Sequence, residues 1–246
     1  MHRAKRAIIM AAGIGVRMQP LTYETPKPLI VVDGKRMIDT VIDALYQNGI
    51  YEVYVVVGYL KEKFSVLKDK YPEIRLIENP FYEQCNNISS LYAAREYIPE
   101  SIILDGDQII YNNNILKPEF ERSGYCCMWT DKKTKEWLLC VKEGVVVSCS
   151  RNGGTSGWQL YSVSFWSKED GERLRKHLTL EFEIKKNRNI YWDDVAMFCY
   201  PEEYKLGIRK IEDGDLVEVD SILELSSLDG RYGYLLKERE DKNDSK

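Results

Sequence analysis

The residues best suited to phosphate chemistry lie near the start of the chain, directly after the apolar stretch at residues 7–12. Gly13 and Gly15 come first, and because glycine has no Cβ they let backbone N–H groups approach an anionic ligand closely. Arg17 and Lys27 follow and supply positive charge. The same pattern also fits a plain glycine turn that ends a strand and carries solvated basic side chains, so by itself it leaves both interpretations open.

Two common phosphate-binding motifs do not match this stretch. The dinucleotide fingerprint requires a third glycine where Met18 stands, and the Walker loop requires a GK[ST] ending that the stretch lacks. A nucleotide bound here would need a different kind of loop.

Length and composition limit the classes of protein that this chain can represent. Its 246 residues, of which 44% are hydrophobic, fit one large α/β domain better than two complete domains. Since 35 Lys and Arg face 39 Asp and Glu, there is no general positive field for nucleic acid, although a local cationic pocket is compatible with this balance.

The cysteines and the hydropathy pattern indicate in which cellular compartment the protein is expected. The six cysteines show no CxxC spacing and no histidine partners at metal-ligand intervals, which predicts reduced thiols and a cytoplasmic location. No segment reaches the roughly 20 apolar residues that a membrane-spanning helix needs, so we expect no membrane partner.

Strands and helices alternate along most of the chain. Apolar, β-branched runs at residues 7–12, 52–58, 74–78, 101–107 and 161–166 predict strands. Between the second and third of these runs, Leu60, Phe64, Leu67 and Tyr71 would share one face of a helix spanning residues 59–71. The alternation predicts an α/β fold with a Rossmann-like, doubly wound, mostly parallel sheet, whose ligands bind beyond the carboxyl ends of the strands.

The pattern changes to short strands and turns from about Gly124. We interpret residues 124–165 as a small β-rich acceptor-binding lobe inserted in a single domain that spans residues 1–236. Residues 237–246 form a charged tail that is expected to be disordered.

The glycine-rich stretch continues into a longer signature. With Pro20, Leu21, Thr22, Pro26, Pro28 and Leu29 it resembles the GxGxRxxPLTxxxPKPL loop that wraps the triphosphate in nucleotidyltransferases making sugar nucleotides and related activated alcohols. Val16 is one departure, because the family usually has Thr or Ser there. The stretches VVVGYLKEKF, ILDGDQ, SVSFW, YWDD and VEVDS follow in the order seen in bacterial LicC-type CTP:phosphocholine cytidylyltransferases, so the resemblance covers most of the chain.

Aspartates at predicted strand ends suit Mg²⁺, which prefers hard oxygen ligands and takes one or two carboxylates together with substrate phosphates. On the resemblance, Asp107 and Asp220 are the expected metal ligands, and Asp105 is expected to support the turn beside the nucleotide. Without the resemblance, a turn or helix cap would be the favoured interpretation of each.

The reaction that the resemblance implies is transfer of CMP from CTP to phosphocholine, giving CDP-choline and pyrophosphate. An acceptor phosphate is already a nucleophile at neutral pH, so no catalytic Ser, Cys or His is required, and the two histidines, His2 and His177, lie outside the motifs. Arg17 is expected to bind the leaving phosphates, and Lys27 to bridge the acceptor and the α-phosphate.

The nucleotide is expected to contact backbone groups near Ala11, Ala12 and Gly58, together with the NNISS segment through Asn86, Asn87 and Ser89. That segment also fits an N-cap cluster for the helix predicted after it. The preference for CTP follows from the resemblance, since single hydrogen bonds to the base cannot be placed from sequence.

The acceptor end can be argued from chemistry. A trimethylammonium group cannot donate N–H hydrogen bonds, so its pocket needs aromatic faces and a nearby carboxylate. Aromatic walls of this kind are predicted at Trp137, Tyr191 and Trp192, with Asp193 and Glu218 as counter-charges, although aromatic residues are equally at home in a core.

Two alternatives remain open at this stage. The same reaction could use 2-aminoethylphosphonate, phosphoethanolamine or a sugar phosphate, and Ser162 stands where LicC-type proteins tend to have glycine. A catalytically silent nucleotide-sensing module is the alternative from another class. The oligomeric state is left open.

Overall fold

A parallel sheet lies at the centre of the fold, in a computed structural model that describes residues 1–236. The predicted tail at residues 237–246 therefore lies outside the described residues. The parallel strands are β2 (Arg6–Ala11), β5 (Glu52–Val57), β6 (Arg75–Glu78) and β7 (Ser101–Asp105). Their order in the sheet is β6-β5-β2-β7, so β2, the first of them in the chain, lies between β5 and β7. These strands are the predicted ones.

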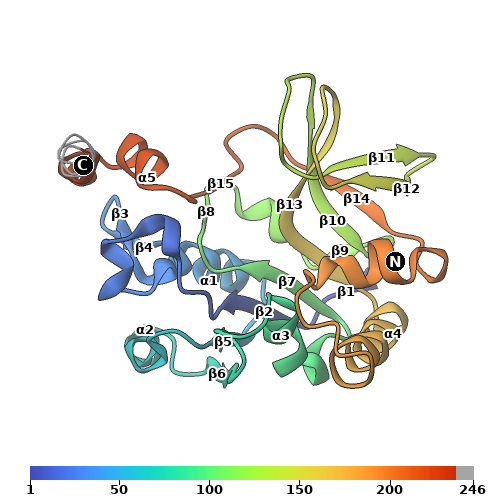
Figure 1. Cartoon of the computed structure of the whole chain (residues 1–246), viewed down its shortest axis with the longest axis horizontal. Coiled ribbons are helices and arrows are strands. Elements are labelled where there is room, and N and C mark those ends of the chain that lie inside the picture. Colours follow the sequence, from blue (N-terminus) through green and yellow to red (C-terminus); the bar gives the residue numbers. More distant parts are fainter. Residues whose placement is uncertain (237–246) are drawn as a thin grey trace.

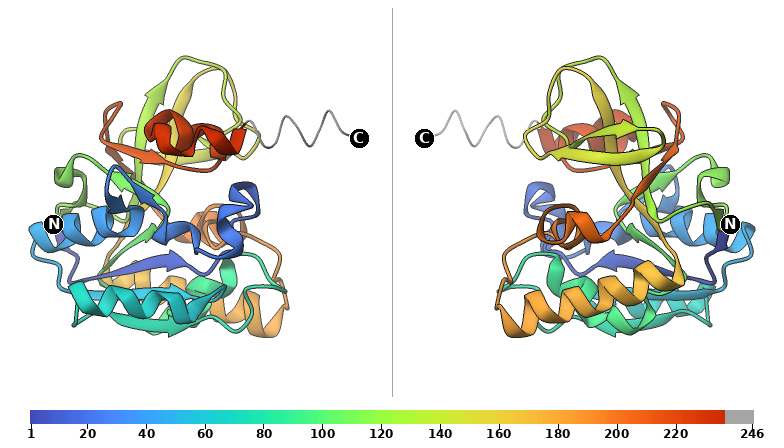
Figure 2. Two further views of the ribbon diagram at one scale, coloured as in Figure 1. Left: turned by 90° about the vertical axis from the view of Figure 1, so that its left-hand side faces the viewer. Right: turned by 90° about the vertical axis from the view of Figure 1, so that its right-hand side faces the viewer.

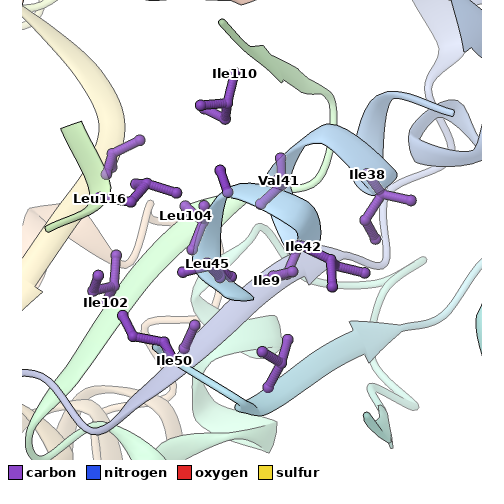
Figure 3. Close-up of a cluster of buried hydrophobic side chains, with 14 of the residues drawn as sticks. Ile9, Ile38, Val41, Ile42, Leu45, Ile50, Ile102, Leu104, Ile110 and Leu116 are labelled. Atoms are coloured by element: carbon purple, nitrogen blue, oxygen red, sulfur yellow. The ribbon is translucent and has the colours of Figure 1, made fainter. Parts of the chain in front are cut away.

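One face of this sheet is covered by helices α1 (Met37–Gln47) and α2 (Leu67–Lys70). Ile9 pairs with Val55 on one side and Leu104 on the other, which sets three apolar side chains in a row. Figure 3 shows this cluster, with Ile38, Val41, Ile42 and Leu45 of α1 packed over the strands. The 3.6-residue spacing of these α1 side chains keeps them on one face of the helix.

The opposite face is covered by α3 (Ile88–Ala93) and α4 (Lys168–Thr179). Ile8 and Ile103, at the alternate positions of their strands, pack there with Leu91 and Leu174. Because neighbouring strand residues point to opposite faces, continuous apolar runs are needed where both faces are covered. The prediction of a doubly wound, mostly parallel α/β sheet is confirmed.

The inserted strands extend the central sheet instead of forming a separate one. They are β10 (Gly124–Thr130), β11 (Leu138–Lys142), β12 (Val145–Ser150) and β13 (Gly157–Trp166). Strand β13 runs antiparallel to β7 through its last residues, and its first residues pair with β10 and β11. Residues 161–166, read as one more strand of the alternating series, therefore belong to a long strand that leads out of the parallel sheet into the lobe (Figure 1).

Shorter elements complete the structure. Strand β14 (Gly207–Lys210) pairs in parallel with β10, and β1 (His2–Arg3) pairs with β9 (Glu119–Phe120). The antiparallel pairs β3 (Val31–Val32) with β4 (Lys35–Arg36) and β8 (Gln108–Ile110) with β15 (Leu216–Glu218) lie outside the main sheet, and α5 (Ile222–Leu228) follows β15. Figure 2 shows α5 and the lobe strands on the same side of the parallel sheet.

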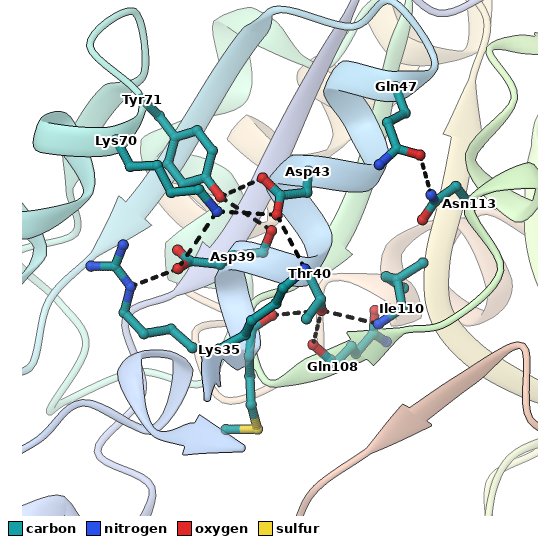
Figure 4. Close-up of polar contacts among 12 residues, drawn as sticks. Lys35, Asp39, Thr40, Asp43, Gln47, Lys70, Tyr71, Gln108, Ile110 and Asn113 are labelled. Atoms are coloured by element: carbon teal, nitrogen blue, oxygen red, sulfur yellow. Dashed lines mark hydrogen bonds and ion pairs between the residues drawn. The ribbon is translucent and has the colours of Figure 1, made fainter. Parts of the chain in front are cut away.

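Polar contacts fix α1 against its neighbours (Figure 4). The hydroxyl of Thr40 accepts a hydrogen bond from the Ile110 N–H of β8 at 3.0 Å. On the α2 side, Asp43 accepts from the Tyr71 hydroxyl at 2.7 Å and pairs with Lys70 at 3.1 Å. Strand β8 is thereby anchored, which matters because Asp107 directly precedes it. No helix within the described part of the chain has the length and apolar character needed to cross a membrane.

The prediction of one continuous helix over residues 59–71 is wrong. The segment consists of 3₁₀ turns at Lys61–Val66 followed by the short α2, and Leu60 before them has a left-handed φ of 49° that no helix continues through. Its buried face is as expected, with Phe64 and Leu67 fully buried. Residues three apart stay on one side of both helix types, so the apolar pattern suits either.

Phe64→Ala should lower the free energy of unfolding by about 3–5 kcal/mol, because it opens a cavity beneath the sheet. Val66→Ala is the matched control: that side chain lies in the same segment but is 41% exposed, and its loss should cost no more than about 0.5 kcal/mol. Urea unfolding of both variants measures the difference, and equal effects would contradict the packing described here.

Candidate active site

A cavity of about 490 Å³ opens beyond the carboxyl ends of β2 and β7 and beneath the lobe. This is the position expected for a ligand in a doubly wound sheet. It gathers most of the residues predicted for the site: Ala11, Gly13, Gly15, Arg17, Lys27, Asn87, Asp105, Asp107, Trp137, Tyr191, Asp193, Glu218 and Asp220.

The glycine-rich loop is folded tightly over Lys27. Gly15 has a left-handed φ of 68°, and a Cβ there would lie 3.0 Å from the Thr22 methyl group and 3.2 Å from Lys27 Cβ. The Thr22 hydroxyl donates to the Gly15 carbonyl at 2.9 Å and closes the loop. Both the backbone conformation and the limited space at position 15 therefore favour glycine.

Lys27 is the centre of the charges in the cavity. Its side chain is only 9% exposed, and its Nζ lies 2.6 Å from Asp107 Oδ2 and 2.7 Å from Asp220 Oδ1. The Arg17 guanidinium, 71% exposed, reaches the same Asp220 oxygen at 2.9 Å. Two cations and two carboxylates from three separate segments thus meet at one point.

The pairing of β8 with β15 explains why the two aspartates are neighbours. Gln108 of β8 lies opposite Glu218 of β15, so Asp107 just before one strand and Asp220 just after the other come to the same end of the pair. Ser221 then caps α5 with its hydroxyl, which starts the helix directly behind Asp220.

The charges of this cluster act on one another. Burial works to lower the pKa of Lys27, but the carboxylates of Asp107 and Asp220 outweigh it and raise that pKa, so the ammonium stays charged. Burial works to raise the pKa of Asp220, and Lys27 and Arg17 together hold it below its usual value. The arrangement presents fixed charges of both signs to a ligand.

A second group of carboxylates lies deeper in the cavity. Burial raises the pKa of Glu218 to about 6, although its Oε1 accepts hydrogen bonds from the Ser162 N–H at 3.2 Å and the Gln108 amide at 2.9 Å. Burial and the facing charges of Asp107 and Glu218 raise the pKa of Asp105 well above its usual value. Asp105 is the last residue of β7, which agrees with the predicted strand end.

Aromatic side chains line the other end of the cavity. Trp137 and Tyr191 meet edge to face with ring centroids 5.7 Å apart at 87°, and Asp193 lines the cavity beside them. Trp192, predicted as a third wall, is 4% exposed and packs in the core between Tyr125 and Trp166. That prediction is wrong, because neighbouring residues on this segment point in opposite directions.

An adjoining cavity of about 320 Å³ takes up the remaining predicted nucleotide residues Ala12, Asn86 and Ser89, together with Asn87. Asn87 does not cap α3 with its side chain; its Oδ1 accepts the Trp192 N–H at 2.9 Å instead.

Gly58 lies outside both cavities. A Cβ there would come within 2.7 Å of the Tyr82 ring, so the close approach of that ring explains this glycine.

Several residues of the two cavities were not predicted as site residues. Glu136, Leu160 and Ser162 line the larger cavity, and Asn79 and Tyr82 line the smaller one. Asn79 directly follows β6, so the rule that ligands bind beyond the carboxyl ends of parallel strands would have indicated it. Glu136 carried no signal beyond its place beside Trp137.

The donor set fits a hard divalent cation. One oxygen each from Asp107 and Asp220 already converges on a single cationic atom, Lys27 Nζ. Within residues 1–236 no group of three or more His, Cys, Asp or Glu side chains is placed to hold a metal. Two carboxylates suit a Mg²⁺ that takes its remaining ligands from substrate phosphates and water.

Comparison with known proteins identifies the class. The chain belongs to the family of the MobA-like NTP transferase domain, whose model matches residues 7–161, and it is a nucleotidyltransferase. A 2-aminoethylphosphonate cytidylyltransferase from Lancefieldella rimae is 38% identical over 233 residues, which is 94% of each chain. A choline-phosphate cytidylyltransferase from Streptococcus pneumoniae is 31% identical over 224 residues, 91% of this chain and 96% of that protein.

A solved structure agrees with the sequence relatives. The CTP:phosphocholine cytidylyltransferase LicC from Streptococcus pneumoniae superposes with a TM-score of 0.85 at 31% identity, covering 93% of this chain and 98% of that one. The inositol-1-phosphate CTP transferase from T. maritima, at 17% identity and a TM-score of 0.74, shares the fold. The predicted resemblance to LicC-type proteins is confirmed.

Asp193→Asn should change how stability depends on pH. Burial raises the pKa of Asp193 to about 7 from a usual value of 3.8, so the folded protein holds a proton there that the unfolded chain releases. Protonation of Asp193 therefore favours the folded state. This contribution to the free energy of unfolding is complete below about pH 4 and is lost as the pH rises through 7.

We therefore expect the melting temperature of the ligand-free variant to exceed that of the wild type at pH 8 and to match it more closely at pH 5. Asp131→Asn, at an exposed position in the lobe, is the control. Parallel pH curves for wild type and Asp193→Asn would contradict the burial of this carboxyl.

Proposed function

We propose that the protein transfers CMP from CTP to phosphocholine, giving CDP-choline and pyrophosphate. The observation that carries this proposal is one cavity with a charged end, where Lys27 Nζ lies between Asp107 and Asp220, and an aromatic end at Trp137 and Tyr191. A substrate with a phosphate at one end and a quaternary ammonium at the other matches both ends. The LicC-type relatives support it.

The proposed reaction needs no covalent intermediate with the protein. An oxygen of the acceptor phosphate attacks the α-phosphorus of CTP, the bond from that phosphorus to the oxygen bridging it to the β-phosphorus breaks, and pyrophosphate leaves with the electron pair. Lys27 is assigned to the acceptor and α-phosphate, where its charge lowers the repulsion between two anions. Arg17, exposed at the mouth of the cavity, is assigned to the leaving phosphates.

Mg²⁺ is the proposed cofactor, with Asp107 and Asp220 as its protein ligands. When bound it would neutralise phosphate charge during transfer. The same two carboxylates pair with Lys27 in the structure and compensate the charge of its buried ammonium.

The nucleotide is assigned to the loop and the adjoining smaller cavity. Gly13 and Gly15 leave backbone N–H groups accessible to phosphate oxygens, and Ala11, Ala12, Asn86, Asn87 and Ser89 are the proposed contacts for the nucleoside, with Asp105 beneath them. The choice of CTP rests on the cytidylyltransferase relatives.

The acceptor's cation is assigned to the faces of Trp137 and Tyr191, with Asp193 and Glu218 as counter-charges. An aromatic face is worth about 2 kcal/mol to a desolvated cation. Ionised Asp193 would hold the cation best.

2-Aminoethylphosphonate is the second candidate acceptor, favoured by two observations. The relative at 38% identity bears that activity in its name. In addition, Glu136, Asp193 and Glu218 all line the larger cavity, and carboxylate oxygens are the partners that a primary ammonium requires. Phosphoethanolamine and sugar phosphates remain as further members of the same reaction class.

Pyrophosphate release tests the function directly. Purified protein should release pyrophosphate when it is given CTP, Mg²⁺ and phosphocholine. Much less pyrophosphate should be released when UTP replaces CTP or when EDTA is added. The panel includes 2-aminoethylphosphonate, phosphoethanolamine and a sugar phosphate. A clear preference for another member would replace phosphocholine as acceptor, and no release with any acceptor would contradict the proposal and favour a nucleotide-sensing role.

Trp137→Leu should reduce the preference for phosphocholine over phosphoethanolamine in kcat/KM by about 5- to 30-fold, because it removes one aromatic face and keeps an apolar side chain. Trp129→Leu, a lobe tryptophan that is 55% exposed, is the matched control and should leave the ratio unchanged. An equal loss on both acceptors in Trp137→Leu would mean that this ring only packs the lobe.

A further inference from the structure

An ion pair joins the lobe to the segment that carries Tyr191. Arg151 directly follows β12, and its Nη2 lies 2.5 Å from Oδ1 of Asp194. The Asp194 side chain is 3% exposed, whereas that of Arg151 is 45% exposed. Exposed ion pairs contribute little, but a buried carboxylate depends on its partner.

The same carboxylate also holds the backbone beside the aromatic wall. Asp194 Oδ2 accepts a hydrogen bond from the Tyr191 N–H at 2.9 Å, and the Asp194 N–H bonds back to the Tyr191 carbonyl at 3.1 Å. One oxygen therefore fixes the turn that presents Tyr191 to the cavity, and the other meets the lobe.

On the lobe side, Arg151 is a neighbour of Trp137. Leu138 pairs with Ser150 in the β11–β12 ladder, so the residues before and after them, Trp137 and Arg151, are also adjacent. Their loops are fastened together by hydrogen bonds between Thr134 and Gly154.

Gly153 makes the close approach of these loops sterically acceptable. Its φ is 68°, and a Cβ at this position would lie 2.0 Å from the Thr134 carbonyl oxygen. Arg151 is thus held at a defined place relative to Trp137.

Aromatic contacts complete the connection. The Arg151 guanidinium carbon lies 3.9 Å from the ring centroid of Phe198 and 5.7 Å from that of Trp137. Phe198 in turn meets the Trp137 ring edge to face at 5.7 Å. Phe198 belongs to a π-helical turn, Val195–Cys199, that begins directly after Asp194, and such turns are frequent at functional sites.

We propose that Arg151 is a positioning residue that sets the acceptor end of the cavity by fixing Trp137 of the lobe against Tyr191 of the body. It acts through Asp194 and Phe198 and touches no reacting atom. This inference rests on the proposed function in assigning Trp137 and Tyr191 to the acceptor. It adds Arg151 and Asp194 as the residues that determine the spacing of those two rings.

Three variants test the proposal by steady-state kinetics with the acceptor that the wild type prefers. Arg151→Ala should raise the KM for the acceptor by roughly 10- to 100-fold, the range expected for misplacement of binding groups by about 1 Å, and change the KM for CTP by less than about 3-fold. Arg151→Lys keeps a charge for Asp194 but loses the planar stacking group, so its acceptor KM should fall between those of Arg151→Ala and the wild type.

Arg173→Ala is the matched control. Arg173 also pairs with an aspartate, Asp170 at 2.6 Å, and lies over a ring, Tyr204 at 5.6 Å, but it is on α4 away from both cavities. Its loss should leave both KM values unchanged. Equal rises in the two KM values for Arg151→Ala, or an effect of similar size in Arg173→Ala, would overturn the proposal.

Hydrogen exchange of the ligand-free protein separates this inference from the proposed function. Amides of residues 190–198 should exchange about 10-fold faster or more in Arg151→Ala than in the wild type, with no such change in Arg173→Ala. If the wild type used none of the acceptors, the proposed function would fail, and faster exchange would still support the positioning of Tyr191 by Arg151. Unchanged exchange in Arg151→Ala would overturn the positioning role whatever the substrate.

Discussion

The ammonium group of Lys27, held between Asp107 and Asp220, is the interaction on which the rest of the site depends. The two carboxylates are 80 and 193 residues away in the sequence, yet both lie within 2.7 Å of the same nitrogen. A buried charge is tolerated only when it is paired. The glycine-rich loop, the end of β7 and the segment after β15 must therefore all be in place before this lysine can be buried.

From that centre, hydrogen bonds lead toward the lobe. One oxygen of Glu218 accepts from both Gln108 of β8 and Ser162 of β13. The pairing of β8 with β15 thus aligns the charged end of the cavity and, through Glu218, connects it to the strand that supports the lobe. The aromatic end that we propose for the acceptor takes Trp137 from that lobe, and the Arg151–Asp194 contact joins the lobe to the segment that carries Tyr191. On the proposed function, phosphate binding and acceptor shape are therefore set by different parts of one framework.

Much of this could be predicted from the sequence where the signal is local. The apolar strands and the loop at residues 13–29 follow from short patterns, and the carboxyl ends of the strands indicated the site. Asp220 was reached only through the family resemblance, because its contact with Lys27 spans 193 residues. Trp192 was misassigned, since adjacent aromatic residues look alike until packing against Trp166 decides which one faces the core. The sequence did not show that β13 runs antiparallel to β7, because its direction depends on pairing with the lobe strands β10 and β11, which no local pattern reveals.

The most direct measurement is the effect of Lys27→Met on kcat and on the KM for CTP. Methionine keeps an apolar stem in the buried position and removes the charge that pairs with Asp107 and Asp220 and that we propose to lie between the two phosphates. If Lys27 acts mainly on the transition state, kcat should fall by about 10²–10³-fold while the KM for CTP changes by less than about 10-fold. A variant with nearly wild-type kcat and a raised KM for CTP would show that Lys27 is only a ground-state binding contact, and would contradict the account.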